Sequence, residues 1–406
     1  MSTFYNREGE KAIKKISKTF RVLLVTGPRQ TGKTTLLKSL MPENMEYVSL
    51  DDLSLREQAK TEPKLFLEEH PFPLFIDEVQ YAPELFPYIK MKVDEKNEKG
   101  MYWLSGSQQF HLMKGVSESL AGRVGIVNLN SFTYAEISKN IENKTVFEPT
   151  KKPDKKPLIN INELFEVIFR GGMPYLYSES EVDREAFFDS YINTYIERDV
   201  RELTNIGNSG AFRRFIVSVA SRTGEQLNYT SLAEDANISV PTAKNWLNIL
   251  VTSGIVYLLE PYLKTNLQRL THTPKIVFMD TGLAAYLSGW RNARDLQLSA
   301  YSGHFLETFI TSEIIKTYNA SGINPNISYY RDKEKNEIDL LFYRNNEVIP
   351  FEIKKTASPV KADLKNFAKI RIKHKTVAGG GLICFCDSVM RLTEDYYAIP
   401  IGSVIL

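Results

Sequence analysis

The first third of the chain alternates short apolar runs with stretches whose apolar residues recur at helical spacing. Apolar runs of this length, bounded by polar or turn-forming residues, are typical of buried strands, and their alternation with helices indicates an α/β fold. An amphipathic helix is expected over residues 8–20, where lysines alternate with apolar residues. Strands are expected at residues 22–25, 46–50, 73–76, 101–104 and 125–129.

The middle of the chain contains a polar segment followed by a region of expected helices. Residues 139–157 are rich in lysine, proline and polar residues, which predicts an exposed linker and a domain boundary. Beyond it, helices are expected at residues 161–169, 212–221, 230–236 and 239–250, and a strand at 255–259. The last three helices followed by a strand are typical of a winged helix-turn-helix, whose third helix reads DNA. That helix offers Lys244 as its only cation, so nucleic-acid binding and protein contact stay open as equal alternatives.

The last part of the chain again predicts helix and strands. A helix is expected at residues 303–315, followed by strands at 327–331, 336–342 and 348–355. Glu352 and Lys354 are two residues apart on the last of these strands, so their side chains project from the same face. Asp339 lies at the start of the preceding strand, and Glu307 lies on the helix.

Composition narrows the class of protein without selecting a function. The chain has 406 residues, of which 43% are hydrophobic and 25% charged, as in an ordinary globular protein of two or three domains. A net charge of +2 implies no partner by itself. Cys384 and Cys386 lie in an apolar run and are expected in the core, and no histidines show zinc-ligand spacing. Without a signal region or a run long enough to span a bilayer, the chain is expected to be cytoplasmic, with no membrane partner.

The strongest chemical signal lies between the first strand and the helix that follows it. A strand, a glycine-rich turn and a helix are the context of a phosphate-binding loop, in which backbone N–H groups and the helix N-terminus face phosphate oxygens. Lys33 would reach the β- and γ-phosphates, and the Thr34 hydroxyl would ligate Mg²⁺. The residues expected to bind the nucleotide are Gly27, Pro28, Arg29, Gln30, Thr31, Gly32, Lys33, Thr34 and Thr35.

Two adjacent carboxylates, Asp77 and Glu78, follow the third strand. They stand at its carboxyl end, the edge at which open α/β sheets bind ligands. Asp77 is expected to hold the Mg²⁺ shell, and Glu78 to orient and deprotonate the attacking water. An acidic pair after a strand can also be a solvated turn, but the phosphate loop upstream favours the functional interpretation.

Two further candidates come from the end of this region. The polar tip of the fourth strand offers Ser107 or Gln108 as a sensor of the γ-phosphate, the alternative being an ordinary turn. Arg123 precedes the fifth strand and could stabilise transition-state charge, in cis or from a neighbouring subunit, or be a surface arginine. The sequence contains no Asn-Lys-x-Asp guanine-reading element, which favours ATP over GTP.

The carboxylates of the last part suggest a second centre. A helix carboxylate, a strand Asp and then Glu-x-Lys is the order used by restriction-endonuclease-like folds. Asp339 and Glu352 are the expected Mg²⁺ ligands, because carboxylates are hard oxygen donors. Lys354 would position the nucleophile or neutralise the transition state, and Glu307 completes the candidate catalytic set. Such domains can also persist as binding modules, so cleavage and binding are alternatives.

Together these motifs resemble the prokaryotic AAA-type ATPases that carry a C-terminal domain of unknown function. The phosphate loop, Leu-Phe-Ile-Asp-Glu, Leu-Ser-Gly-Ser-Gln and Ala-Gly-Arg carry the resemblance in the first part. Gly-x-x-x-Glu, Tyr-Arg-x-x-x-x-x-Glu-x-Asp and Phe-Glu-Ile-Lys carry it in the last part, although Asn336 and Glu337 stand where a Pro-Asp pair is usual. The resemblance implies a P-loop sheet with strand order 5-1-4-3-2 and helices on both faces.

We therefore expect an α/β ATPase domain with ATP and Mg²⁺ as cofactors, joined to a nuclease-like domain. The expected segments are the ATPase domain at residues 1–140, a linker at 141–160, a helical and winged-helix region at 161–275 and a restriction-endonuclease-like domain at 276–406. One hypothesis is an ATP-regulated enzyme that acts on DNA or RNA. The other is an ATP-driven switch whose C-terminal region binds a partner without cleaving it. An oligomer remains open, since Arg123 acting in trans would require one.

Overall fold

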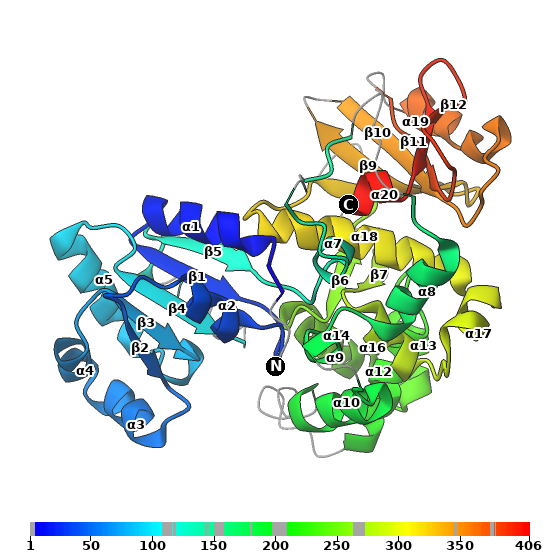
Figure 1. Ribbon diagram of the computed structural model, residues 1–406. Helices are drawn as coiled ribbons and strands as arrows, with labels where there is room; N and C mark the ends of the chain where they lie inside the picture. The colour runs from blue at the N-terminus through cyan, green and yellow to red at the C-terminus, as the bar shows by residue number, and fades with distance from the viewer. Residues whose placement is uncertain are drawn as a thin grey trace.

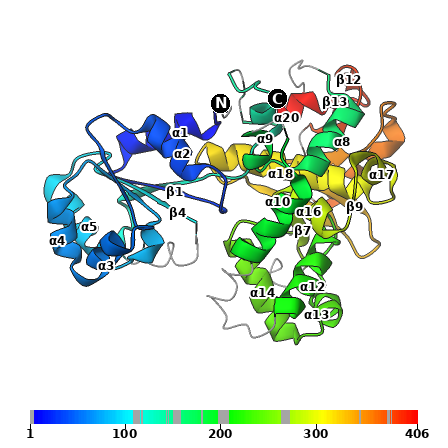
Figure 2. The same ribbon diagram turned by 60° about the horizontal axis from the view of Figure 1, so that its bottom comes forward.

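The computed structural model (Figure 1) describes residues 5–107, 116, 119–142, 144, 146–149, 158–178, 181–196, 209–262, 273–344, 347–373, 377 and 379–406. The described residues gather into two lobes, which lie side by side in both Figure 1 and Figure 2. The N-terminal lobe is coloured blue to cyan, and the second lobe holds the helical region and a separate C-terminal sheet.

A five-stranded parallel sheet forms the centre of the N-terminal lobe. Its strands are β1 (Val22–Thr26), β2 (Glu46–Ser49), β3 (Leu74–Asp77), β4 (Tyr102–Gly106) and β5 (Val124–Asn128). Their order, β2-β3-β4-β1-β5, is the expected order 5-1-4-3-2 read from the opposite edge, which confirms that prediction. β1, β3 and β4 are buried along their whole length, as central strands covered on both faces should be.

Helices cover both faces of this sheet. Alternate residues of β1 point to opposite faces, so Leu23 and Val25 join one apolar cluster while Val22 and Leu24 join another. α1 and α2 contribute to the first cluster, and α4 and α5 to the second. The helices of this lobe are α1 (Gly9–Thr19), α2 (Lys33–Leu40), α3 (Leu53–Thr61), α4 (Pro63–Glu69) and α5 (Leu85–Lys96), with a 3-10 turn η1 (Val79–Tyr81) after β3.

The second lobe begins with helices. They are α7 (Tyr134–Ile137), α8 (Ile161–Arg170), α9 (Tyr175–Ser178), α10 (Arg184–Tyr191), the π-helical turn η2 (Ile192–Ile196), α12 (Ser209–Ala220), α13 (Tyr229–Ala236) and α14 (Val240–Thr252). β6 (Val256–Leu259) follows α14 and pairs antiparallel with β7 (Lys275–Phe278), so the expected order of three helices and a strand is present. The expected boundary between residues 275 and 276 falls at the start of β7.

A mixed six-stranded sheet closes the chain, in the order β12-β13-β11-β10-β9-β8. Its strands are β8 (Ile327–Arg331), β9 (Glu337–Arg344), β10 (Glu347–Ile353), β11 (Gly381–Cys384), β12 (Met390–Arg391) and β13 (Tyr397–Pro400). The helices of this part are α16 (Thr281–Leu287), α17 (Ala293–Leu298), α18 (Ser302–Ala320), η3 (Lys361–Leu364), α19 (Phe367–Lys373) and α20 (Gly402–Ile405). Cys384 and Cys386 are buried free thiols, as expected of core residues.

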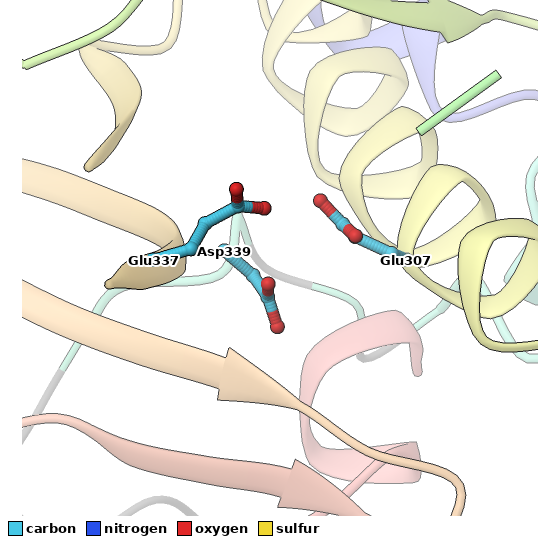
Figure 3. Close-up of side chains that lie close together, drawn as sticks. All are labelled: Glu307, Glu337 and Asp339. Carbon is cyan, nitrogen blue, oxygen red and sulfur yellow. The ribbon is translucent and has the colours of Figure 1, made fainter. Parts of the chain in front are cut away.

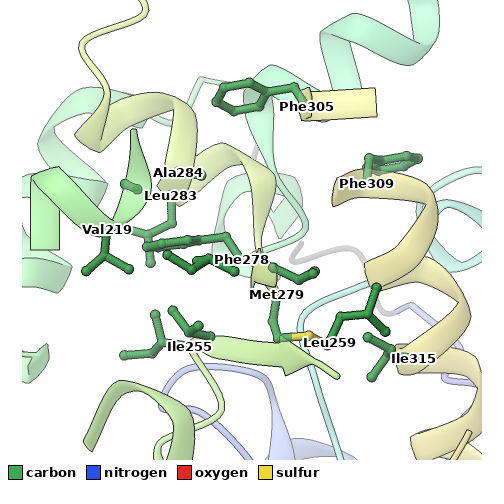
Figure 4. Close-up of a cluster of buried hydrophobic side chains, with 14 of the residues drawn as sticks. Val219, Ile255, Leu259, Phe278, Met279, Leu283, Ala284, Phe305, Phe309 and Ile315 are labelled. Atoms are coloured by element: carbon green, nitrogen blue, oxygen red, sulfur yellow. The ribbon is translucent and has the colours of Figure 1, made fainter. Parts of the chain in front are cut away.

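α18 is the central element of the second lobe (Figure 1). Phe305, Phe309 and Ile315 on this helix pack into the apolar cluster of Figure 4, which also contains Phe278 of β7 and Leu283 of α16. α18 also contacts α1 and β5 of the N-terminal lobe. Within the part of the chain that the structure describes, no helix has the length and apolar character needed to cross a bilayer.

Candidate functional site

The phosphate loop follows the carboxyl end of β1 directly, as its sequence predicts. Gly27 has φ +149°, and a Cβ there would lie 2.0 Å from the carbonyl oxygen of Leu129. Gly32 has φ +84° and precedes the first turn of α2. Both positions therefore require glycine, the first because of close backbone approach and the second because of its left-handed conformation.

Lys33 is buried and folds back over this loop. Its Nζ donates hydrogen bonds to the carbonyl oxygens of Gly27 and Pro28, at 3.1 and 2.8 Å. The hydroxyl of Thr31 also donates to Pro28, at 2.9 Å. The lysine ammonium thus lies on the concave side of the loop, where a phosphate group would be bound.

The Thr34 hydroxyl and the Asp77 carboxylate face one point at the carboxyl edge of the sheet. Thr34 Oγ1 donates to Asp77, with distances of 2.8 Å to Oδ2 and 3.1 Å to Oδ1. The hydroxyls of Tyr47 on β2 and Ser105 on β4 also donate to this carboxylate. Burial, together with the charge of Asp77, raises the pKa of Tyr47 to about 12. A partly buried hydroxyl and a buried carboxylate are hard oxygen donors, so this pair fits Mg²⁺.

Glu78 directly follows Asp77 and takes an unusual backbone conformation. Its φ of +54° is left-handed, which turns the chain sharply at the end of β3. Glu78 Oε2 accepts a hydrogen bond from Ser107 Oγ at 3.3 Å and another from Gln80. The structure therefore brings two sequence candidates, Glu78 and Ser107, into contact, while the alternative sensor Gln108 lies outside the described residues.

Arg123 lies at the amino ends of the strands, whereas the phosphate loop lies at their carboxyl ends. It immediately precedes β5, which runs parallel to β1 with Val124 opposite Val22, so the strand length of roughly 16 Å separates it from the loop. Its guanidinium donates to both carboxylate oxygens of Asp94, at 2.5 and 2.8 Å, and this hydrogen bond lowers the pKa of Asp94. Arg123 therefore does not face the phosphate loop of its own chain, and its action in cis has no support from this geometry.

Arg7, which the sequence analysis did not single out, holds the phosphate loop from behind. Its side chain is 6% exposed and donates to Thr31 O at 2.7 Å and Asn130 O at 2.8 Å. It also pairs with Glu136 at 3.0 Å, and its guanidinium lies 4.7 Å from the centroid of the Phe132 ring. These partners are distant in the sequence, so no local pattern could have indicated them.

A cavity of about 440 Å³ opens beside the phosphate loop. It lies between the start of α2 and the segment that leads into α9. Its lining combines aromatic rings with polar groups of the loop and includes Tyr5, Arg7, Gln30, Thr35, Phe132 and Tyr175. Aromatic walls with a few polar groups suit the base and sugar of a nucleotide.

The second candidate centre lies between α18 and β9. Glu307 of α18 and Glu337 and Asp339 of β9 converge there (Figure 3), and one carboxylate oxygen from each lies within 4.8 Å of the others. Glu337 and Asp339 are two residues apart on one strand, so they share a face. The structure thus brings the expected pair Glu307 and Asp339 together and adds Glu337. The spacing of Glu337 from Asp339 was visible in the sequence and could have indicated it.

A lysine lies among these carboxylates. Lys275 Nζ is 2.6 Å from Glu307 Oε1 and 2.5 Å from Glu337 Oε1, and its side chain is 2% exposed. Burial lowers the pKa of Lys275, but the charges of Glu307, Asp339 and Glu337 outweigh that effect and the net pKa is raised. Arg331 pairs with Glu337 Oε2 at 2.8 Å. The donor set suits a divalent ion by residue type, but it already surrounds an ammonium group.

Glu352 and Lys354 differ in how they relate to this centre. Burial, followed by the charge of Asp339, raises the pKa of Glu352 to about 9, and burial raises that of Glu307 to about 8. Glu352 Oε2 is buried and has no hydrogen-bond partner among the described residues. Lys354 instead turns toward Asp363, with Nζ 2.9 Å from Oδ1, and its side chain is 37% exposed. The structure therefore does not bring Lys354 into contact with the three carboxylates.

Three family models match successive parts of the chain. A model described as an AAA domain matches residues 19–138. A domain of unknown function (DUF8612) matches residues 161–294, and a second domain of unknown function (DUF4143) matches residues 302–404. The first and last matches confirm the resemblance carried by the sequence motifs.

Three relatives found by sequence are each described as an uncharacterized protein. Proteins of Mycobacterium bovis and Mycobacterium tuberculosis are each 28% identical over 340 residues, which is 83% of this chain and 71% of the relative. A protein of Methanocaldococcus jannaschii is 24% identical over 275 residues, 59% of this chain and 57% of that protein.

Solved structures match more distantly. A Walker-type ATPase of Pyrococcus abyssi aligns with 70% of this chain and 96% of that chain, at 15% identity and a TM-score of 0.44. RuvB of Thermotoga maritima aligns with 63% of this chain and 90% of that chain, at 14% identity and a TM-score of 0.29. Similarity at this level carries no argument about function, which rests on the geometry of the sites.

Proposed function

We propose that this P-loop AAA-type ATPase, which carries a C-terminal domain of unknown function, binds ATP with Mg²⁺ and hydrolyses it. The observation that carries the proposal is the hydrogen-bonded pair of Thr34 and Asp77, at 2.8 and 3.1 Å, beside the phosphate loop. Loop hydroxyl and strand carboxylate are the two protein ligands that a P-loop NTPase uses for Mg²⁺. Their contact supports the assignment of both residues.

The phosphate loop supplies the groups that bind the phosphates. Its backbone N–H groups, from Gly27 to Thr35, would cradle the phosphate oxygens, and Lys33 would exchange its two carbonyl partners for the β- and γ-phosphates. Mg²⁺ held by Thr34 and Asp77 would neutralise charge on the same phosphates. The cavity beside the loop would take the base and sugar of ATP.

Glu78 is the proposed general base. It adjoins Asp77 in sequence and touches Ser107, so its carboxylate is held at the same edge of the sheet. From there it would orient the attacking water and accept a proton from it, while Ser107 keeps the carboxylate in place.

The test compares Glu78→Gln with Lys33→Ala and the wild type. Glu78→Gln should bind ATP as the wild type does and hydrolyse it about 100-fold more slowly or worse, because the amide cannot accept the proton. Lys33→Ala should lose ATP binding itself. Turnover at the wild-type rate in Glu78→Gln would show that another group is the base.

A second candidate function is cleavage of DNA or RNA at the C-terminal centre. The convergence of Glu307, Glu337 and Asp339 favours it, because these carboxylates could hold a divalent ion that activates water. Glu352 would supply a further carboxylate at the same face. The alternative is an ATP-driven switch whose C-terminal region binds a partner without cutting it.

Cleavage assays with Mg²⁺ or Mn²⁺, with and without ATP, separate these alternatives. Metal-dependent cutting by the wild type that disappears in Asp339→Ala supports the nuclease, provided that the variant still binds ATP. Absence of cutting in every nucleotide state supports the switch.

Arg123 fits one further role, in trans. Because it faces away from its own phosphate loop, it could stabilise transition-state charge only in a neighbouring subunit. An Arg123→Ala chain should then lose hydrolysis while keeping ATP binding, and should regain activity when mixed with Lys33→Ala chains that supply the arginine. No rescue on mixing would return Arg123 to the role of a surface arginine paired with Asp94.

A further inference from the structure

We propose that the ammonium group of Lys275 is the built-in cation of the C-terminal carboxylate centre and competes there with a divalent metal ion. The inference rests on the second candidate function, in which Glu307, Glu337 and Asp339 hold such an ion. It adds the regulation of that centre, because a metal ion can enter only as Lys275 leaves.

Lys275 uses the same oxygens that a metal ion would need. Its Nζ contacts Oε1 of Glu307 at 2.6 Å and Oε1 of Glu337 at 2.5 Å. A divalent ion binds through carboxylate lone pairs, which are the lone pairs that accept these hydrogen bonds. The unit charge of the ammonium also repels any second cation brought to the cluster. Lys275 is therefore a direct competitor of the metal ion.

The surroundings of Lys275 favour this position. It begins β7, where it lies opposite Leu259 of β6, and its side chain is 2% exposed. The ammonium lies 5.3 Å from the centroid of the Tyr329 ring. A buried ammonium needs opposite charge nearby, since water no longer solvates it. The lysine and the carboxylates thus neutralise one another in the absence of metal.

The neighbouring cations do not take this place. Arg331 contacts the other oxygen of Glu337, and its side chain is 31% exposed. Lys354, the lysine that the Glu-x-Lys pattern indicated, pairs with Asp363. Among the cations that the structure describes, Lys275 is the one that bridges two carboxylates of the centre.

The test is the Mn²⁺ affinity of the full-length chain without nucleotide, measured by titration calorimetry. With Lys275 still present, the single substitution Glu307→Gln should change the Mn²⁺ affinity by less than about threefold, because Lys275 already occupies the centre. Lys275→Met should bind Mn²⁺ on the order of 10-fold more tightly or better, because it removes a positive charge in contact with two ligands. Combining Lys275→Met with Glu307→Gln should abolish that gain.

A control variant and a second measurement distinguish this effect from a general loss of charge or of structure. Lys369→Met removes a half-exposed lysine that pairs with Glu334 and should leave the Mn²⁺ affinity within about threefold of the wild type. Thermal unfolding gives a readout independent of calorimetry: Mn²⁺ should raise the unfolding midpoint of Lys275→Met much more than that of the wild type.

Tight Mn²⁺ binding by the wild type that Glu307→Gln removes would overturn the proposal, and this comparison needs no Lys275 variant. A Lys275→Met chain that binds Mn²⁺ no more tightly than the wild type, or an equal gain in Lys369→Met, would also overturn it. A wild type that cuts neither DNA nor RNA refutes only the second candidate function, because the Mn²⁺ affinities test the lysine without any cleavage.

Discussion

The carboxyl group of Glu352 shows how strongly the C-terminal sheet controls the charge of one residue. Its buried Oε2 has no hydrogen-bond partner among the described residues, and burial raises its pKa to about 9. In the unfolded chain a glutamate titrates near ~4.3. Between these two values the folded protein keeps a proton that the unfolded chain releases. The free energy of unfolding therefore falls as the pH rises through this window.

We expect Glu352→Gln to raise the free energy of unfolding at pH 8 by on the order of 1–3 kcal/mol, and to have a much smaller effect at pH 5. The amide needs no proton to be neutral, whereas the folded wild type must keep one at pH 8. The measurement is chemical denaturation at both pH values, with the exposed Glu394→Gln as control. An equal effect of Glu352→Gln at pH 5 and pH 8 would contradict the raised pKa.

At the scale of single residues, the sequence could indicate the functional residues that lie in short, recognisable motifs. Thr34 and Asp77 were expected near one another because loop and strand ends meet at one edge of the sheet, and their hydrogen bond agrees with that. Lys275 carried no such signal. Its partner Glu307 is 32 residues away, and a lysine at the start of a strand usually faces solvent.

Two glycine-containing turns pack against each other, one after α8 and the other after the carboxyl end of β7. Gly171 follows α8 with φ +82°, and a Cβ there would lie 2.3 Å from Asp280 Oδ1 and 2.9 Å from the Cα of Gly282. The next residue, Gly172, donates its N–H to Asp280 Oδ2 at 2.9 Å. Gly171 also lies close to the α16 N-terminus, which Asp280 caps through the N–H of Leu283. The two turns therefore interlock through backbone contact.

Gly171→Ala should lower the free energy of unfolding by about 2 kcal/mol or more, because it adds left-handed strain to a clash with a fixed carboxylate. Gly303→Ala is the matched control, since a Cβ there meets no heavy atom within 4 Å. That control should be neutral or stabilising by up to ~1 kcal/mol, as alanine favours a helix. Denaturation curves of the two variants decide the matter, and equal destabilisation would refute the interlock.

At the scale of elements, the apolar pattern predicted most of the second lobe and the five strands of the first sheet, whereas the order of those strands was implied by the family resemblance. Expected and observed bounds agree within a few residues for α8, α13, β8 and all five strands of the first sheet. Short apolar runs in a parallel sheet are buried on both faces, so their pattern is simple. The pattern could not show that β6 pairs with β7, because β6 ends at Leu259 and β7 begins at Lys275, and no short hairpin turn joins them to signal the pairing.

Across the whole molecule, buried polar contacts connect the phosphate loop to the helix that carries Glu307. Arg7 joins Thr31 of the loop to Glu136 of α7. At the start of α7, the N–H of Tyr134 donates to Glu313 of α18 at 2.6 Å. Glu313 is 1% exposed, and this burial raises the pKa of its carboxyl group. These hydrogen bonds form a continuous path from the loop through α7 to α18, and we expect a shift of the loop to reach α18 along it.

ATP binding should displace the loop, because Lys33 must exchange the carbonyls of Gly27 and Pro28 for phosphate oxygens. We expect ATP to slow amide hydrogen exchange in α7 and α18 as well as in the loop. Arg7→Gln should keep the response of the loop and lose that of α18, because it breaks the connection at Thr31 and Glu136. Arg21 precedes β1, away from the loop, and its guanidinium donates a hydrogen bond to Asn97. The control variant Arg21→Gln should therefore keep both responses. Hydrogen exchange measured by mass spectrometry with and without ATP tests this, and an intact α18 response in Arg7→Gln would show that the two lobes communicate by another route.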